Sequence, residues 1–237
     1  MKAWQQDQLE LLLSTKNPEQ LFQRLVALSR QLDFDYCAYG IRMPLPVTSP
    51  RIVMYNNYPG DWRRIYLERG YVNVDPTVKH GGRSMFPVVW SDKLFEPAQE
   101  LWEEARSFGL RHGWARSSFG NNGIAGLMTL SRAAEPLSEI ELRDKSMMMD
   151  WLTQAAHISM SKCLVPKLMP ELEAKLSKQE IAVLRWTGEG YCSREIADLM
   201  NIAERTVNFH ANNAMVKLNA SNKTAAVMRA AVLGLLY

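Results

Sequence analysis

The run SREIADLMNIAERTVNFHANNAMVKL, residues 193–218, decides the fold of the C-terminal part of the chain. Its first eight residues place Ile196, Ala197 and Met200 on one face of a short helix, which Ser193 is expected to cap. A tight turn over 201–203 and a longer amphipathic helix over about 204–218 follow. A short helix, a three-residue turn and a longer helix form a helix-turn-helix.

The longer helix can be divided by angle, because each residue of an α-helix turns the chain by about 100°. One stripe is apolar and predicts the core face; it consists of Val207, Ala211, Ala214 and Leu218. The opposite face is polar and consists of Arg205, Asn208 and Asn212. Asparagine can bond both N6 and N7 of adenine, so the polar face suits a DNA major groove. The alternative is that both asparagines are simply solvated.

Further features support a complete helical domain of about sixty residues. Ser177 and Glu180 form a capping box at the start of a helix that ends at Gly188–Gly190, and a last helix is expected over about 222–235. Several cationic and hydroxyl side chains surround the motif and are predicted phosphate partners: Ser193, Arg194, Thr206, Lys217 and Lys223.

A polar stretch with two prolines precedes this domain. Because Pro166 and Pro170 each disfavour helix at the preceding residue, we expect a linker over 166–175 rather than a continuous helix. The predicted domains are therefore residues 1–165 and 176–237.

The N-terminal domain mixes two periodicities. Helical spacing occurs over 5–32 and 137–164, and short β-like runs lie between them, at 36–43, 51–57, 113–119 and 124–131. The Asn122-Gly123 step predicts a hairpin between the last two runs. The expected fold class is α+β, with an N-terminal α/β/α sandwich around an antiparallel sheet and a C-terminal all-α domain of four helices.

Composition narrows the functional classes. The chain has 237 residues, 47% of them hydrophobic, and a net charge of +3, which permits nucleic-acid binding without requiring it. No long apolar run or secretory signal is visible, which predicts a cytoplasmic protein with no membrane association. Cys37, Cys163 and Cys192 have neither disulfide nor zinc spacing, so we expect three buried thiols, no metal and no cofactor.

An aromatic cluster over residues 57–77 is the densest unusual feature upstream. Trp62 and Tyr66 are four apart and face the same way, Tyr58 precedes them, and Asp75 stands before a proline. Aromatic residues at this spacing often form a core patch. However, phenols, an indole N–H and a carboxylate all need partners when buried, and a small polar-headed ligand would supply them.

The C-terminal motifs resemble the DNA-binding domain of LuxR-type regulators. The similarity runs through Ser177–Glu180, Trp186, Glu195–Ala197, Thr206–Val207 and Lys217–Leu218, and covers residues 175–235. It implies that Asn208 and Asn212 occupy positions from which family members reach bases.

Residues 20–165 resemble the autoinducer-binding domain of the same family, whose ligands are N-acyl-homoserine lactones. The resemblance implies that Trp62 donates to the lactone carbonyl, that Asp75 accepts from the amide N–H, and that Tyr58 and Thr129 contact the acyl carbonyl. The remaining expected ligand-site residues are Arg63, Tyr66, Thr77, Trp90 and Gly113. Chain length would depend on a lining formed by residues such as Ala38, Gly40, Leu110, Ala125 and Leu127.

The resemblance further implies a homodimer that binds an inverted repeat in double-stranded DNA, with RNA polymerase as a further partner. A ligand-independent member of the family is the first alternative. A response regulator would need a βα-repeat receiver domain, which is not visible. A lactone-processing enzyme would need a metal cluster or an activated nucleophile, and neither a Gly-x-Ser-x-Gly elbow nor a His-rich metal motif is visible. Cys37 could form a dyad with His80 or His112 only if the fold happened to bring them together. The sequence leaves open the acyl chain length, the operator, and activation against repression.

Overall fold

The computed structural model describes residues 3–173 and 175–236. Met1, Lys2, Ala174 and Tyr237 lie outside the described residues, and with them one position of the expected linker and the outer ends of both expected domains. The chain forms two compact units. The first comprises Met1–Arg42, Arg51–Gly120 and Ile124–Leu164, and the second comprises Met43–Pro50, Asn121–Gly123 and Val165–Tyr237.

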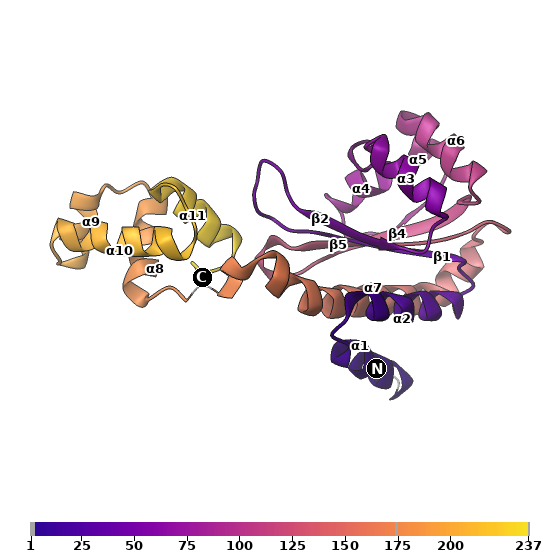
Figure 1. The fold of residues 1–237 in the computed structure, drawn as a ribbon, viewed down its shortest axis with the longest axis horizontal. Coiled ribbons are helices and arrows are strands. Elements are labelled where there is room, and N and C mark those ends of the chain that lie inside the picture. Colours follow the sequence, from indigo (N-terminus) through magenta and orange to yellow (C-terminus); the bar gives the residue numbers. More distant parts are fainter. Residues whose placement is uncertain (1–2, 174, 237) are drawn as a thin grey trace. The chain divides into compact units, whose positions relative to one another are not determined.

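The first unit is built on a five-stranded antiparallel sheet in the order β2-β1-β5-β4-β3 (Figure 1). The strands are β1 (Tyr36–Arg42), β2 (Ile52–Asn56), β3 (Val88–Val89), β4 (His112–Phe119) and β5 (Ala125–Arg132). The short turn Asn121–Gly123 joins β4 to β5. The expected antiparallel sheet and α+β class are confirmed, although β3 was not foreseen.

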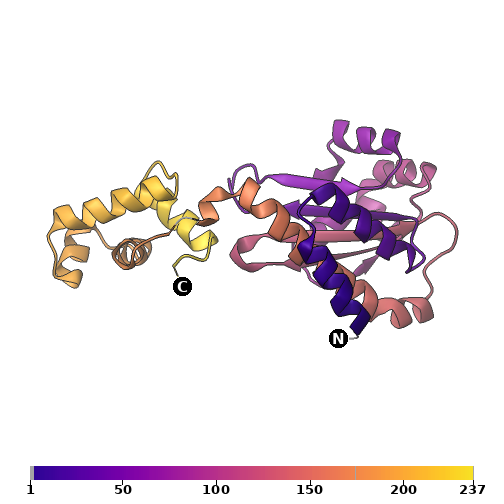
Figure 2. The same cartoon turned by 60° about the horizontal axis from the view of Figure 1, so that its bottom comes forward.

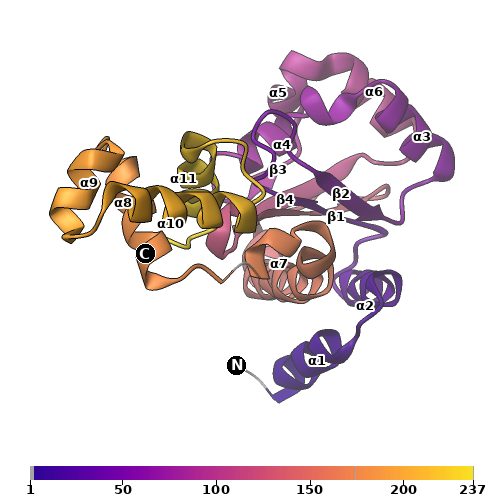
Figure 3. The same cartoon turned by 60° about the vertical axis from the view of Figure 1, so that its left-hand side comes forward.

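Helices cover both faces of this sheet. Figure 3 shows one group above the sheet: α3 (Gly60–Glu68), α4 (Pro76–Gly81), α5 (Asp92–Phe95) and α6 (Gln99–Ser107). Short 3-10 turns occur at Tyr71–Asn73 and Glu96–Ala98. Below the sheet lie α2 (Pro18–Arg30) and α7 (Glu139–Leu168), and Figure 2 brings them forward together with α1 (Ala3–Ser14).

Strand alternation separates two interiors. Cys37, Tyr39 and Ile41 of β1 are buried toward α7, where the Tyr39 hydroxyl lies 2.9 Å from Nδ1 of His157. The residues between them in the chain face α3–α6. Register carries this pattern across the sheet, because Ala38 pairs with Thr129 and Gly40 with Leu127.

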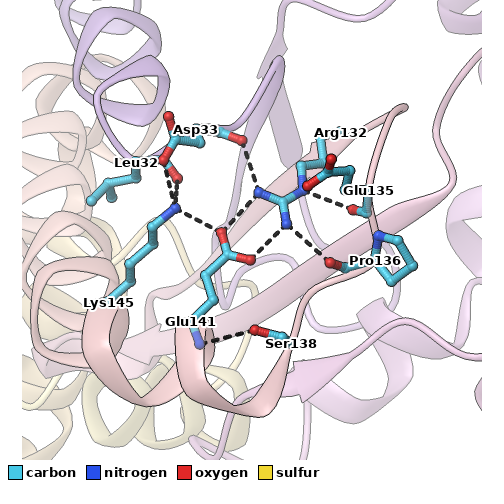
Figure 4. Close-up of polar contacts among 8 residues, drawn as sticks. All are labelled: Leu32, Asp33, Arg132, Glu135, Pro136, Ser138, Glu141 and Lys145. Carbon is cyan, nitrogen blue, oxygen red and sulfur yellow. Dashed lines mark hydrogen bonds and ion pairs between the residues drawn. The ribbon is translucent and has the colours of Figure 1, made fainter.

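A charged cluster ties the lower layer to the end of the sheet (Figure 4). Arg132 of β5 makes two hydrogen bonds to the Glu141 carboxylate of α7, at 2.8 and 2.6 Å. Lys145 bonds Glu141 at 2.7 Å and the carboxylate of Asp33 at 2.8 Å. These contacts fix the first turns of α7 against the strand that precedes it and the loop that follows α2.

The second unit is helical, with α8 (Lys178–Gly188), α9 (Ser193–Met200), α10 (Glu204–Lys217) and α11 (Lys223–Val232) after a 3-10 turn at Pro170–Glu173. The expected capping box is present, because the Ser177 hydroxyl accepts from the Glu180 N–H and the Glu180 carboxylate accepts from the Ser177 N–H. Gly190, with φ of 98°, ends α8, and Asn201, with φ of 52°, ends α9. The predicted helix-turn-helix is therefore formed by α9, 201–203 and α10.

The helical spacing over 5–32 corresponds to two helices, α1 and α2, because Asn17 caps a new helix whose first residue is Pro18. Three local predictions are wrong. The expected break at Pro166 is absent, since α7 continues to Leu168 with the proline inside it. Cys192, not Ser193, is the N-cap of α9. Only Cys37 of the three thiols is buried; Cys163 is half-buried and Cys192 exposed.

Within the described residues, no helix combines the length and the apolar character needed to cross a bilayer.

Candidate ligand site and DNA-binding surface

A cavity of about 670 Å³ lies between the upper face of the sheet and helices α3–α6. Eight of the nine expected ligand-site residues line it: Tyr58, Trp62, Arg63, Tyr66, Asp75, Thr77, Trp90 and Thr129. The five residues expected around an acyl chain also line it: Ala38, Gly40, Leu110, Ala125 and Leu127. Its volume is within the range of small-molecule sites.

The polar end of the cavity is organised by Asp75. Its Oδ1 accepts from the N–H of Thr77 at 2.8 Å and from the Thr77 hydroxyl at 2.6 Å, which caps α4. Its Oδ2 accepts from the Tyr66 hydroxyl at 2.9 Å. The Val78 N–H also hydrogen-bonds the carboxylate. Tyr66 is the side-chain donor to Oδ2, and a carboxylate oxygen has two lone pairs, so a ligand N–H can share this atom with Tyr66.

Burial governs the charges at this end. Desolvation raises the pKa of Asp75, although the hydrogen bonds from Thr77 and Tyr66 oppose the shift. Desolvation also raises the pKa of Tyr58 and Tyr66, and the Asp75 charge adds to it. Both phenols are therefore neutral. The Tyr66 O–H already donates to Asp75, so Tyr58 is the phenol that can donate a hydrogen bond to a ligand carbonyl oxygen.

Gly113 does not line the cavity but acts through Trp90. A Cβ atom at this position would lie 2.3 Å from Cδ2 of the Trp90 indole, so only glycine lets the ring lie against β4. The Trp90 ring then meets Phe95 at 5.8 Å and Trp102 at 6.0 Å, both edge to face. Its buried Nε1 has no hydrogen-bond partner among the described residues.

Sequence reasoning missed part of the aromatic cluster beside the cavity. Phe95 and Trp102 stack at 4.5 Å, and Phe108 lies 5.8 Å from Trp62. The helical spacing of Leu101, Trp102 and Ala105, all buried, would have indicated that α6 covers the cavity.

The surroundings of Cys37 do not favour a nucleophilic dyad with a histidine. Cys37 is completely buried and its sulfur lies 3.6 Å from that of Met128. Burial raises the pKa of the thiol to about 12, so it stays protonated. No group of three or more potential metal ligands occurs among residues 3–173 and 175–236.

In the second unit, three of the residues expected to read DNA bases lie on the exposed side or the flank of α10. Arg205 and Asn212 are exposed, and Asn208 is half-buried. Thr206 is half-buried, and Arg194 is exposed on α9. The structure thus brings most of the expected DNA-contacting residues together around α9 and α10.

Asn208 is held in one orientation. The ammonium of Lys223 donates to its Oδ1 at 2.7 Å, and the Ser193 hydroxyl donates to the same atom at 3.0 Å. Lys223 also donates to the Ser193 oxygen at 2.7 Å. An ammonium can only donate, so the atom that faces Lys223 is the amide oxygen, and the amide N–H groups point elsewhere.

Lys217 has a different role from the expected phosphate contact. Its ammonium donates to both oxygens of Glu180, at 2.9 and 2.8 Å, and to the carbonyl of Lys175 at 3.1 Å. All three N–H donors are therefore occupied. Although burial opposes it, Lys217 and the Ser177 N–H lower the pKa of Glu180. This contact stabilises the start of α8 and argues against a DNA-binding role for Lys217.

A small-molecule cavity in one unit and a helix-turn-helix in the other define a ligand-responsive regulator of transcription. Residues 17–160 match the autoinducer binding domain family, and residues 174–230 match the family of bacterial regulatory proteins called the luxR family. The chain belongs to the LuxR family.

Named relatives agree with this assignment. The chain is 44% identical to the transcriptional activator protein SolR of Ralstonia nicotianae, over 98% of both chains. It is 44% identical to the transcriptional activator protein AnoR of Acinetobacter nosocomialis, over the full length of both. The crystal structure of Escherichia coli SdiA is 32% identical and similar with a TM-score of 0.88, over 99% of this chain and 98% of that one. SdiA in complex with octanoyl-rac-glycerol gives a TM-score of 0.84, over 99% and 96%.

Proposed function

We propose that this chain is a quorum-sensing transcription factor that binds an N-acyl-homoserine lactone in the cavity of its first unit. In the liganded state it binds, as a homodimer, an inverted repeat in double-stranded DNA and acts on RNA polymerase in the cytoplasm. The observation that carries the proposal is the buried Asp75 carboxylate, whose Oδ2 a ligand N–H can share with Tyr66, in a largely apolar cavity.

The polar groups fit the head of such a ligand. Oδ2 of Asp75 suits the amide N–H, and the neutral Tyr58 phenol and the Thr129 hydroxyl suit the acyl carbonyl. Trp62 is 3% exposed and lines the same cavity, where its indole N–H would serve the lactone carbonyl. Arg63 is exposed and its guanidinium extends over Gly60, which suits a contact to a 3-oxo group.

The far end of the cavity fits an acyl chain. Ala38, Gly40, Ala125 and Leu127 offer only small or apolar surface, and about 0.8 kcal/mol per buried CH₂ group would favour a chain there. A solved structure of SdiA, whose fold this chain shares, is a complex with octanoyl-rac-glycerol, an amphiphile of the same general kind.

The dimer is supported by the surface of α7. Ile140, Met147 and Ile158 are 64%, 82% and 49% exposed and recur at seven and eleven residues, which places them on one stripe of the helix. On α1, Trp4 packs against Trp151 of α7 at 5.6 Å, and Leu11 is exposed. Helices near residues 5–25 and 140–163 are thus the proposed dimer surface.

Thermal denaturation with and without lactones tests the ligand. We expect N-acyl-homoserine lactones of a suitable chain length to raise the melting temperature, by mass action on the folded state. Expression with a mixture of chain lengths, followed by mass spectrometry of the extract from the purified protein, would identify the preferred one. If no lactone of any length shifts melting or co-purifies, the ligand part of the proposal is wrong, and a ligand-independent regulator is the better assignment.

A further inference from the structure

A large aromatic ring lies in the middle of the outward face of α10. Phe209 is 60% exposed, and its ring meets only the neighbouring His210 edge to face, at 5.6 Å, among the ring contacts of the described residues. At about 100° per residue, Arg205, Phe209 and Asn212 all lie within about 50° of the direction opposite the core stripe. The helix does not need Phe209 for packing, because its core contacts come from Val207 and Ala211.

The residue on the flank of the same helix, Asn208, already has hydrogen-bond partners within the protein. Asn208 lies about 90° from the core direction, and its Oδ1 accepts from both Lys223 and Ser193. Bidentate recognition of adenine requires that oxygen to accept from N6 while the amide donates to N7. Asn208 offers only the donor half, so base discrimination falls to the residues on the outward face.

The surroundings of Phe209 indicate what covers it. Arg205 and Asn212 flank the ring, and the cationic Arg194 and Lys223 belong to the neighbouring helices. A positively charged and amide-bearing face is complementary to DNA and unsuited to a purely apolar protein partner. The ring would therefore meet the floor of a major groove.

We propose that Phe209 recognises the C5-methyl group of a thymine in each half-site of the operator. A phenyl ring has no hydrogen-bond donor or acceptor, so it distinguishes bases only by apolar contact. The thymine methyl is the apolar group that normal base pairs present in the major groove. This inference rests on the proposed DNA-binding function and adds the base that one position of the helix selects.

Selection of binding sites from a random duplex library is the first step of the test. The full chain, purified with N-octanoyl-homoserine lactone, should enrich a site with a required thymine in each half. Replacing that thymine by deoxyuridine removes only the methyl group. We expect about fourfold weaker binding per half-site for the wild type, from about 0.8 kcal/mol per buried CH₂ group.

Two variants complete the test. In Phe209→Ala the deoxyuridine penalty should disappear, whereas in Val216→Ala, an exposed apolar residue three turns along α10 from Arg205, it should persist. Both residues are exposed, so the melting temperature should not change.

The proposal is overturned if the wild type shows no deoxyuridine penalty at any selected thymine, or if Phe209→Ala keeps it. A Phe209→Ala variant that weakens both duplexes while the penalty persists would place the ring in a contact that does not read the methyl. If the wild type enriches no sequence at all, the DNA-binding function fails first, and the inference falls with it.

Discussion

At the scale of single residues, the two carboxylate oxygens of Asp75 have different roles. Oδ1 caps α4, while Oδ2 accepts from Tyr66 and faces the cavity. In Asp75→Asn the amide oxygen can keep the cap, but an N–H₂ group replaces the acceptor. We expect the unliganded protein to lose only about 1 kcal/mol of stability. The ligand-induced rise in melting temperature should vanish, because the new donor opposes the amide N–H of the ligand.

Tyr66→Phe is the matched control for this substitution. It removes the hydroxyl that occupies Oδ2 but leaves the carboxylate, so the thermal shift by a lactone should persist. Equal loss of the shift in both variants would mean that the region is merely disrupted and that Asp75 is no specific ligand contact.

Asn208 is the residue whose interpretation changes most with the structure. From the sequence alone, Asn208→Ala should weaken specific binding by about 1–3 kcal/mol and leave non-specific binding intact. With its oxygen held by Lys223 and Ser193, the free amide donor suits a phosphate oxygen. We now expect Asn208→Ala to lose similar affinity for the operator and for unrelated DNA.

Lys223→Ala should make the slope of log affinity against log salt concentration shallower, by about 0.9 for each phosphate that the variant no longer neutralises.

Competition assays over a range of salt concentrations measure both effects. If Asn208→Ala loses affinity for the operator but not for unrelated DNA, Asn208 contacts a base rather than a phosphate. If the salt dependence of Lys223→Ala equals that of the wild type, Lys223 does not contact a DNA phosphate.

The resemblance to the autoinducer-binding domain predicted which residues gather around the cavity, but not how their atoms are used. Spacing alone left a core patch open, whereas eight of the nine expected ligand-site residues line the cavity. The role of Gly113 depends on the Trp90 ring, which comes from another part of the chain. Likewise, the occupied donors of Lys217 depend on Glu180, which lies on another helix. Such pairings are tertiary and leave no local signal.

At the scale of elements, the start of α7 depends on the cluster of Arg132, Glu141 and Lys145. Hydrogen bonds from Arg132 lower the pKa of Glu141 to about 2, and those from Lys145 add to this against the effect of burial. Glu141→Gln removes the charge and should cost about 2–3 kcal/mol in the free energy of unfolding. Urea denaturation followed by tryptophan fluorescence measures it, because six of the seven tryptophans precede residue 165.

The pH dependence of this cost has a definite sign. The pKa of Glu141 in the folded state lies below its ordinary value of 4.5, so its contribution is complete above about pH 4.5 and is lost as the pH falls toward 2. The wild type and Glu141→Gln should therefore differ most near neutral pH and converge in acid. Arg64→Ala, which breaks the exposed pair with Glu68, should cost under about 0.5 kcal/mol throughout. A cost of Glu141→Gln that does not change with pH would contradict the assigned role of the charge.

Strong periodicity identified most elements, and weak or conflicting signals account for the errors. The two residues of β3 are too few to show alternation. The step Asn17-Pro18 carried a helix-start signal that the continuous apolar spacing concealed. At Pro166 the expected break fails, because α7 already has more than six turns of helix before the proline and ends two residues after it.

At the scale of the whole molecule, ligand binding and DNA binding are expected to be coupled through folding and dimerisation. A cavity of this size without ligand leaves buried polar groups such as Trp90 Nε1 without partners among the described residues. Each such group costs about 1–3 kcal/mol. A ligand that fills the cavity therefore increases the population of the folded dimerising surface.

The last prediction follows from symmetry. Two α10 helices related by a two-fold axis would meet the major groove one helical turn apart, so the operator should be an inverted repeat. A duplex with both half-sites should bind the liganded chain far more tightly than one with a single half-site, and insertion of half a turn between them should abolish the difference.

Met147→Glu places a charge at the centre of the exposed stripe of α7 and should reduce binding to the full operator to the level of a half-site. Light scattering should show this variant as a monomer with unchanged lactone-induced stabilisation. A dimeric Met147→Glu that keeps full affinity would move the interface away from α7.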